Sequence, residues 1–440
     1  MKVTAFNDWY ACDLSDLIAV IESGQRPYGG VTEESGEIPS LGGENIRQDG
    51  GVTLHVLKKV PTDFYRSMTK GVLQPQDVLL NKDGANTGKI GIYGGEFSIA
   101  TINEHLFLLR GKPDRLVQRF LYRILVSEHG QRTIRAKISG SAQPGLKSDF
   151  IRHFPVFIPN STAEQSRIAA VLDTLDEAIA KTEAVIAKLK QVRAGLLHDL
   201  LTRGLDEHGQ LRDPIAHPEQ FKDSLLGRIP REWEAKELRD CYAIPSRNGL
   251  YKKAGYYGSG NRMVHMPQMF KDVTVDVSDA VRVEVEPHEL QRYSLEAGDL
   301  LFARRSLNLE GAGLCSIVPS LDESTTFESS IIRVRLEKTK MVARFTAEFL
   351  RSECGYLLRR PFIRQVAVSG VSSEDVGHFL VPCPPLNEQS RILTLLELYD
   401  RAVSSHQNEL RKLTYLKSAL MSDLLTGRVR VPADIFKENP

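Results

Sequence analysis

The chain has 440 residues, of which 41% are hydrophobic and 26% are charged, and this composition is typical of globular rather than disordered proteins. The length predicts two to four domains with full cores. Lys plus Arg number 57 against 56 for Asp plus Glu, so a surface that binds nucleic acid must be basic locally.

The N-terminal residues lack the basic flank and apolar stretch of a signal peptide, and no run of about 18 apolar residues occurs. We therefore expect a chain that is neither secreted nor membrane-spanning. The five cysteines stand far apart, without a Cys-x-x-Cys pair, at Cys12, Cys241, Cys315, Cys354 and Cys383. This pattern favours the reducing cytoplasm and argues against a zinc or redox motif.

Residues 1–163 are expected to form a first α+β domain. Strands are predicted at 78–80, 90–93 and 105–109, and a helix at 117–127. The segment from Gly84 to Lys89 superficially resembles a phosphate-binding loop, but it has three residues between its glycines and a strand after the lysine. It is better interpreted as a β-hairpin loop that presents Lys82, Asn86, Thr87 and Lys89 to DNA.

A basic stretch follows in the same domain. Residues 104–152 hold ten Lys or Arg against four acids, which is a net charge of about +6 by count. A solvated helix face is the alternative explanation. The glycine-rich segment 140–147 favours DNA binding, because polar side chains on a loop reach phosphates and base edges. The candidates here are Lys137, Ser141, Gln143 and Lys147.

Residues 164–203 are expected to form one long helix. Its first letters, EQSRI, return at 388–392, and an ungapped offset of 224 makes 15 of 39 positions identical between 164–202 and 388–426. Apolar residues spaced three and four apart predict a helix with a packing seam in each copy. The seam residues are Ile168, Leu172, Leu175, Ile179 and Leu189 in the first copy, and Ile392, Leu396, Tyr399, Val403 and Leu413 in the second.

Polar residues interrupt the two seams at matching places, at Thr182 and Arg193 and at His406 and Lys417. Such paired interruptions suit two helices that meet each other, and the alternative is that each helix packs only on its own domain. Residues 204–230 are rich in Gly, Pro and charge, and predict a linker.

Residues 231–386 are expected to repeat the first domain, because 295–302 resemble 73–80. Strands are predicted at 300–303, 316–319 and 331–336, with a helical stretch at 343–358. Basic density is low in 343–378, so DNA contacts are expected earlier. The candidates are Arg247, Asn248, Tyr251, Lys252, Arg304, Arg305 and Asn308. The second long helix, 387–428, and a tail, 429–440, complete the chain.

Catalytic signatures are missing from the sequence. Gly-x-Ser-x-Gly, His-Glu-x-x-His and paired acids at metal-ligand spacing do not occur. The segment Cys383-Pro384-Pro385-Leu386 resembles the Asn/Asp-Pro-Pro-aromatic motif of amino-methyltransferases, yet it lacks the polar first residue and the aromatic last one. We expect a chain without catalytic or metal-binding residues.

The segments PNSTAEQSRIAAVLDTLDEAI, PPLNEQSRILTLLELYDRAV and FKDSLLGRIPREWE, and the endings DLLTRGL and DLLTGRVRV, resemble the DNA specificity subunit of type I restriction-modification systems. The resemblance covers essentially the whole chain. It implies a pseudo-twofold tandem repeat in which two target recognition domains are separated by two long helices packed as an antiparallel coiled coil.

The resemblance also implies a role. Each recognition domain would read one half of a bipartite double-stranded DNA site, and the helices would set the spacing. The subunit would need no cofactor of its own. It would recruit two methylation subunits, which use S-adenosylmethionine to methylate adenine N6, and two restriction subunits, which use ATP and Mg. A coiled-coil scaffold that binds no nucleic acid, and an enzyme cut short, are the alternatives.

Overall fold

The computed structural model describes residues 8–34, 36–47, 49–140, 144–365 and 369–435. The candidates Ser141 and Gln143 lie outside these ranges. The chain divides into two compact units, one made of residues 1–184 and 408–440 and the other of residues 185–407. Each long helix is therefore shared between the units, which differs from the division in chain order that the sequence suggests.

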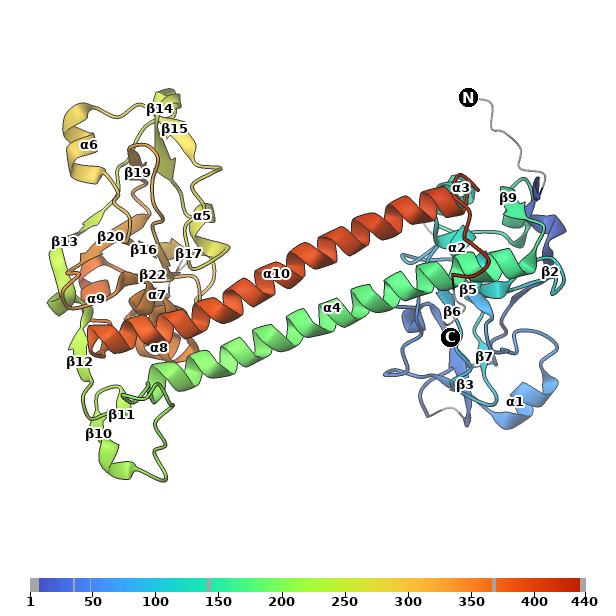
Figure 1. The fold of residues 1–440 in the computed structure, drawn as a ribbon, viewed down its shortest axis with the longest axis horizontal. Coiled ribbons are helices and arrows are strands. Elements are labelled where there is room, and N and C mark those ends of the chain that lie inside the picture. The colour runs from blue at the N-terminus through green and yellow to red at the C-terminus, as the bar shows by residue number, and fades with distance from the viewer. Residues whose placement is uncertain (1–7, 35, 48, 141–143, 366–368, 436–440) are drawn as a thin grey trace. The chain divides into compact units, whose positions relative to one another are not determined.

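Unit 1, in which Figure 1 labels β2, β5 and β6, is built on an antiparallel four-stranded sheet of order β2-β8-β5-β6. Val78, Leu80 and Phe107 face one core, and Leu79 and Leu108 face another. Both faces of the sheet are covered, which explains why its strands are continuously apolar rather than alternating. The strands are β2 (Ile18–Ser23), β5 (Val78–Asn81), β6 (Ile90–Ile92) and β8 (Leu106–Gly111).

Smaller elements complete unit 1. A mixed sheet of order β4-β3-β7 covers one face, and β1 pairs with β9. The strands are β1 (Trp9–Asp13), β3 (Ile38–Leu41), β4 (Lys59–Val60), β7 (Thr101–Ile102) and β9 (Pro155–Pro159), and the helices are α1 (Thr62–Ser67), α2 (Gln118–Val126) and α3 (Glu128–Lys137). The predicted strands and helix of this domain are all present, within a few residues of the expected ends.

Unit 2 repeats this plan. Its four-stranded sheet has the order β13-β20-β16-β18, its mixed sheet has the order β15-β14-β19, and β12 pairs with β23. The strands are β12 (Glu234–Glu237), β13 (Tyr242–Asn248), β14 (Tyr257–Val264), β15 (Val281–Val283), β16 (Leu300–Ala303), β18 (Cys315–Ile317), β19 (Thr325–Phe327), β20 (Ile331–Leu336) and β23 (Leu380–Cys383). The predicted α+β class is confirmed for both units.

Unit 2 also holds a short sheet of order β17-β22-β21. Its strands are β17 (Arg305–Ser306), β21 (Arg364–Gln365) and β22 (Ser369–Gly370), and the helices of the unit are α5 (Pro267–Phe270), α6 (Pro287–Tyr293), α7 (Ala343–Arg351), α8 (Glu353–Arg359) and α9 (Ser373–Gly377). The helical stretch expected at 343–358 is present, divided into two helices at Ser352. Ser352 ends α7 and caps α8 by accepting a hydrogen bond from the Gly355 amide at 3.2 Å.

The long helices α4 (Thr162–Thr202) and α10 (Leu386–Leu424) pack antiparallel. In unit 1, Ile168 near the start of α4 shares a core with Leu424 at the end of α10. In unit 2, Leu200 near the end of α4 shares a core with Ile392 at the start of α10. The seam predicted from helical spacing is confirmed, and the helices also pack on the domains.

The linker and the tail contain more structure than the sequence suggests. Within the predicted linker 204–230, β10 (Phe221–Ser224) and β11 (Gly227–Pro230) form a hairpin. After α10 the chain returns to unit 1, where Val431 is buried in the core and Arg430 forms an ion pair with Glu164.

Candidate nucleic-acid interface

Two candidate loops of unit 1 lie side by side. The Leu146 amide donates to the Lys82 carbonyl at 2.7 Å, the Gly84 amide donates to the Pro144 carbonyl at 3.1 Å, and Asp83 and Gly145 form a β-bridge. The hairpin loop 82–89 is therefore fastened to the glycine-rich segment that holds Lys147. Residues far apart in sequence form one surface at the ends of β5 and β6.

The side chains on this surface have different surroundings. Asn86 and Lys147 are exposed. The Thr87 hydroxyl donates to the carbonyls of Gly84 and Pro144, at 2.6 and 3.2 Å, so it holds the two loops together. Lys82 places its ammonium 5.3 Å from the Phe107 ring centroid, and Lys89 is partly buried. Asn86 and Lys147 are thus the most available of the set to a ligand.

Lys137, at the end of α3, donates to the Arg152 carbonyl at 2.9 Å. Many other cations of the basic stretch are also engaged inside unit 1. Arg110 forms a bidentate pair with buried Asp77 at 2.6 and 2.7 Å, and Arg123 bridges to Asp173 and Asp176 of α4. The charge count therefore overstates the cations free to meet phosphate, because some of them bind groups within the domain and Arg123 docks it onto the long helix.

In unit 2 the first candidate group lies at the end of β13. Arg247 rests over the Tyr293 ring, with its guanidinium carbon 5.7 Å from the ring centroid. The Asn248 side-chain oxygen accepts from the Ser373 hydroxyl at 2.8 Å, and Tyr251 is 74% exposed. The Lys252 side chain is only 8% exposed and forms an ion pair with Glu289 at 2.5 Å, so its charge is the least available.

The second candidate group of unit 2 follows β16. The Arg304 carbonyl accepts from the Val371 amide at 3.0 Å, and Arg305 pairs with Gly370 in the short sheet. The Asn308 side-chain oxygen accepts from the Gly311 amide at 3.0 Å, so it stabilises its own turn. Arg305 and Asn308 are exposed, whereas Arg304 is partly buried.

The structure adds Arg364, which sequence reasoning missed. It lines a small pocket with Arg304, Arg305 and Ser372, and its side chain is 75% exposed although it lies 3.2 Å from Asp375. The run Arg359, Arg360 and Arg364 is a basic cluster that could have pointed to it. Only strand pairing shows that β21 and β17 lie on the two sides of β22 in one sheet.

The two candidate surfaces occupy matching places. Lys82 directly follows β5, and Arg304 directly follows β16, which are the corresponding strands of the two four-stranded sheets. The preceding turns also agree, since Asp77 binds Arg110 and Asp299 binds Arg335 bidentately at 2.7 and 2.8 Å. The same frame therefore presents dissimilar polar loops at the same end of each sheet.

Two of the four polar interruptions, Arg193 and Lys417, form ion pairs with aspartates of the other helix. Arg193 of α4 binds Asp400 of α10 at 2.5 Å in unit 2, and Lys417 of α10 binds Asp176 of α4 in unit 1. The pairs are related by the offset of 224. The candidate packing residues agree: Ile168, Leu172, Ile392 and Leu396 are buried, and Leu175, Ile179, Leu189, Tyr399, Val403 and Leu413 are partly buried.

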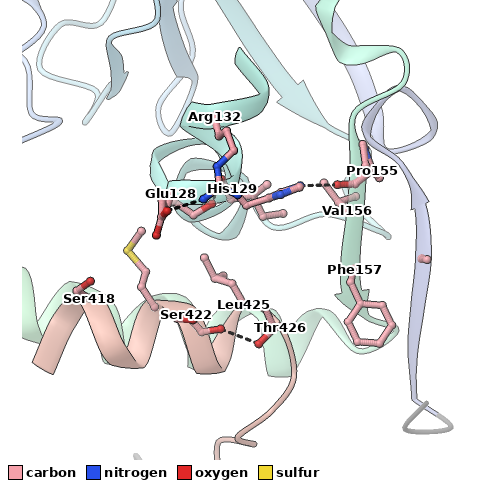
Figure 2. A pocket seen from close by; sticks show the side chains of 14 residues that line it. Glu128, His129, Arg132, Pro155, Val156, Phe157, Ser418, Ser422, Leu425 and Thr426 are labelled. Carbon is pink, nitrogen blue, oxygen red and sulfur yellow. Dashed lines mark hydrogen bonds and ion pairs between the residues drawn. The ribbon is translucent and has the colours of Figure 1, made fainter. Parts of the chain in front are cut away.

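A separate pocket lies in unit 1 between α3, β9 and the last turns of α10 (Figure 2). Its apolar wall includes Val156, Phe157 and Leu425, and Glu128 and Arg132 form an ion pair at 2.5 Å beside it. None of the DNA-binding candidates lines it. The described residues contain no cluster of His, Cys, Asp or Glu arranged for a metal, and none of their helices has the length and apolarity to cross a membrane.

Comparison with known proteins finds specificity subunits of type I restriction enzymes. Residues 7–191 match the type I restriction modification DNA specificity domain. The type I restriction enzyme MjaVIII specificity subunit of Methanocaldococcus jannaschii is 23% identical, over 96% of this chain and 93% of that protein. The EcoKI specificity subunit of Escherichia coli K12 is also 23% identical, over 92% and 84%.

Solved structures agree on the fold. The S subunit of a type I restriction-modification system from M. genitalium has a TM-score of 0.54 at 15% identity, covering 96% of this chain and 98% of that one. A chain from a study of assembly and conformational transition in a type I system has a TM-score of 0.57 at 14% identity, covering 97% and 100%. Over 92 to 96% of its length the chain is similar to specificity subunits of type I restriction enzymes, and residues 7–191 match their DNA specificity domain.

Proposed function

We propose that this chain is the non-catalytic DNA-reading subunit of a type I restriction-modification complex, in which each recognition domain contacts one half of a bipartite site. The observation that carries this proposal is the matched pair of domains. Their sheets have the same strand order, while the loops at the same sheet ends carry different polar residues. A common frame with dissimilar loops suits the reading of two different half-sites.

The helices supply the proposed spacing. A helix of 41 residues, such as α4, is about 60 Å long at 1.5 Å per residue. This exceeds the roughly 34 Å that separates successive turns of DNA. A scaffold without DNA binding is not favoured, because the relatives are named specificity subunits.

We further propose that the chain assembles in the cytoplasm with two methylation subunits and two restriction subunits. The tandem repeat supports the number, since two related domains and two related long helices occur in one chain. S-adenosylmethionine, ATP and Mg would be bound by those partners. Mass measurement of the purified assembly tests the count, and one methylation subunit per chain at saturation would contradict it.

Methylation mapping tests the proposed function. The chain is expressed with its methylation subunit in a host without adenine methylation, and the genome is sequenced for N6-methyladenine. We expect a motif of two short blocks separated by unspecified bases. A single continuous motif would contradict the two-domain reading. If the purified complex neither methylated nor retained duplex DNA, the proposed function itself would be contradicted.

A further inference from the structure

An arginine of unit 2 is buried without a counter-ion. Arg333 in β20 is 5% exposed, and its Nε is enclosed without a hydrogen-bond partner. Among the described residues its side chain forms no hydrogen bond or ion pair. Its strand neighbours Ile332 and Val334 face the helix-covered core, so Arg333 lies on the other face with Ile331.

The surroundings of Arg333 add positive charge. Arg247 of β13 stands directly opposite it in the strand ladder. Asp299, whose charge acts on Arg333, does not neutralise it by direct contact, since both Asp299 oxygens bind Arg335. Burial lowers the pKa of Arg333, Asp299 opposes this shift, and Arg335 and Arg247 lower the pKa further. Like charges opposite each other in a sheet are destabilising, and so is a buried cation without a partner.

The fold does not need an arginine at this place. In unit 1 the corresponding ladder joins Glu22 of β2 to Leu108 of β8, and Leu108 also pairs with Leu79. In unit 2 Arg333 pairs with Leu301 in the same way. Leu108 is fully buried in the unit 1 core. A leucine therefore satisfies the same sheet position, and Arg333 is retained at a cost in stability.

The two arginines lie beside the candidate DNA surface. Arg247 is on the edge strand β13, next to Asn248, which pairs with Ile332. Its recorded side-chain contact is the Tyr293 ring, which it can leave without breaking an ion pair. A phosphate group would supply the missing negative charge, because a guanidinium binds phosphate oxygens through strong, paired hydrogen bonds.

We infer that Arg333 and Arg247 form a phosphate-binding site in the second recognition domain, and that it takes a backbone phosphate of the bound DNA. The inference rests on the proposed function and deepens it, since it assigns a backbone contact to a buried residue. Such a contact positions the domain on the duplex without reading a base.

The test uses the complex of the full chain with its methylation subunit and a 30-base-pair duplex of unrelated sequence. Arg333→Leu takes the residue that unit 1 holds at this place. We expect it to keep or raise the thermal midpoint, to weaken duplex binding roughly tenfold, and to reduce the salt slope by about one. Arg247→Ala should reduce the slope similarly. Lys338 is an exposed lysine just after β20. Lys338→Ala should change neither the duplex affinity nor the salt slope.

Each outcome decides the matter. A lower midpoint for Arg333→Leu would assign the arginine to the fold, and an unchanged affinity and slope would remove it from the DNA surface. Either result overturns the inference. The proposed function would stand in both cases, provided that the wild-type complex binds the duplex. Inorganic phosphate at constant ionic strength is the second probe. Stabilisation by phosphate with an unchanged duplex slope would indicate a site for free phosphate instead. Failure of the wild-type complex to bind any duplex would overturn the proposed function.

Discussion

Glu164 and Glu388, the first letters of the two EQSRI copies, are both buried in ion pairs. Glu388 binds Arg212, which follows α4, and Glu164 binds Arg430, which follows α10. The next residue, Gln165, accepts from the Val117 amide at 2.9 Å and donates to two carbonyls. Gln389 does the same with the Val342 amide at 2.7 Å. The repeated Glu and Gln therefore fasten the start of each helix to its domain, and these two side chains are not available to a partner.

We predict that Glu388→Gln lowers the free energy of unfolding by about 3 kcal/mol, because buried Arg212 loses its buried counter-charge and keeps only the exposed carboxylate of Glu232 at 3.4 Å. The side chains of Glu388 and Arg212 are 4% and 8% exposed. Denaturant unfolding measures the loss. Glu397→Gln, which removes an exposed pair with Arg401, is the matched control and should cost less than about 1 kcal/mol. Equal effects of both changes would contradict the assignment.

Backbone and base contacts should separate by variant. Lys147→Ala should weaken binding to all duplexes and reduce the salt slope by about one, because a phosphate contact is lost. Asn86→Ala or Arg305→Ala should instead relax one position of the motif, by about 1 to 3 kcal/mol if a bidentate base contact is lost. Competition binding with motif and scrambled duplexes measures both. Uniform losses for all three variants would remove the base-reading role.

At the scale of elements, each long helix ends in the same way. Gly204 follows α4 with φ +61°, and Gly427 follows α10 with φ +69°. A left-handed residue at this position is a common helix C-terminus. Space adds a second reason at Gly204, where a Cβ would lie 2.4 Å from the Trp233 ring. Gly427 packs against Trp9, the residue 224 positions before Trp233. Each long helix thus ends near a glycine that lies against a tryptophan.

The helices should act as a ruler. Inserting Ala-Glu-Ala-Lys after Lys181 and again after Lys412 lengthens both helices between their two cross-helix ion pairs, by about 6 Å with about 40° of rotation. At about 3.4 Å per base step, the spacer of the methylated motif should grow by one or two base pairs with unchanged half-sites. Methylation mapping measures the spacer.

The insertion in α4 alone is the control. It moves Arg193 one turn relative to Asp176, while Asp400 and Lys417 keep their spacing, so one of the two ion pairs is broken. We expect a lower thermal midpoint for this variant than for the paired insertion. An unchanged spacer with full methylation in the paired variant would show that the helices do not set the distance.

At the scale of the whole molecule, the two units share a frame but not the charges that dock it. Arg123 of α2 binds aspartates of α4 in unit 1. At the corresponding position of unit 2, Glu348 of α7 binds Arg193 at 3.1 Å. A domain moved from one unit to the other would therefore set a carboxylate against carboxylates. The two domains match in fold, and the opposite charge of Arg123 and Glu348 determines which end of the helix pair each domain docks on.

Exchange of residues 234–383 for the second domain of a relative should change one half-site only. The exchange cuts at β12 and β23, which pair with each other, and keeps Trp233 and Glu388. Grafted domains that carry a carboxylate at position 348 should fold and pair with Arg193 of α4. Grafted domains with an arginine at position 348 should not dock on α4, because two arginines would then face each other. Mapping of the methylated motif decides, and a change in both half-sites would contradict modular reading.

The sequence by itself determined the repeat, the long helices and most strands, because helical spacing and apolar runs are local signals. Tertiary structure decided where the charges go. Arg193 and Asp400 are 207 residues apart in the chain, and no local pattern distinguishes this arginine from an exposed one. The same holds for Arg333, whose missing partner is a property of the folded interior. A cation's role depends on burial and on its neighbours, and these are set only when distant segments pack together.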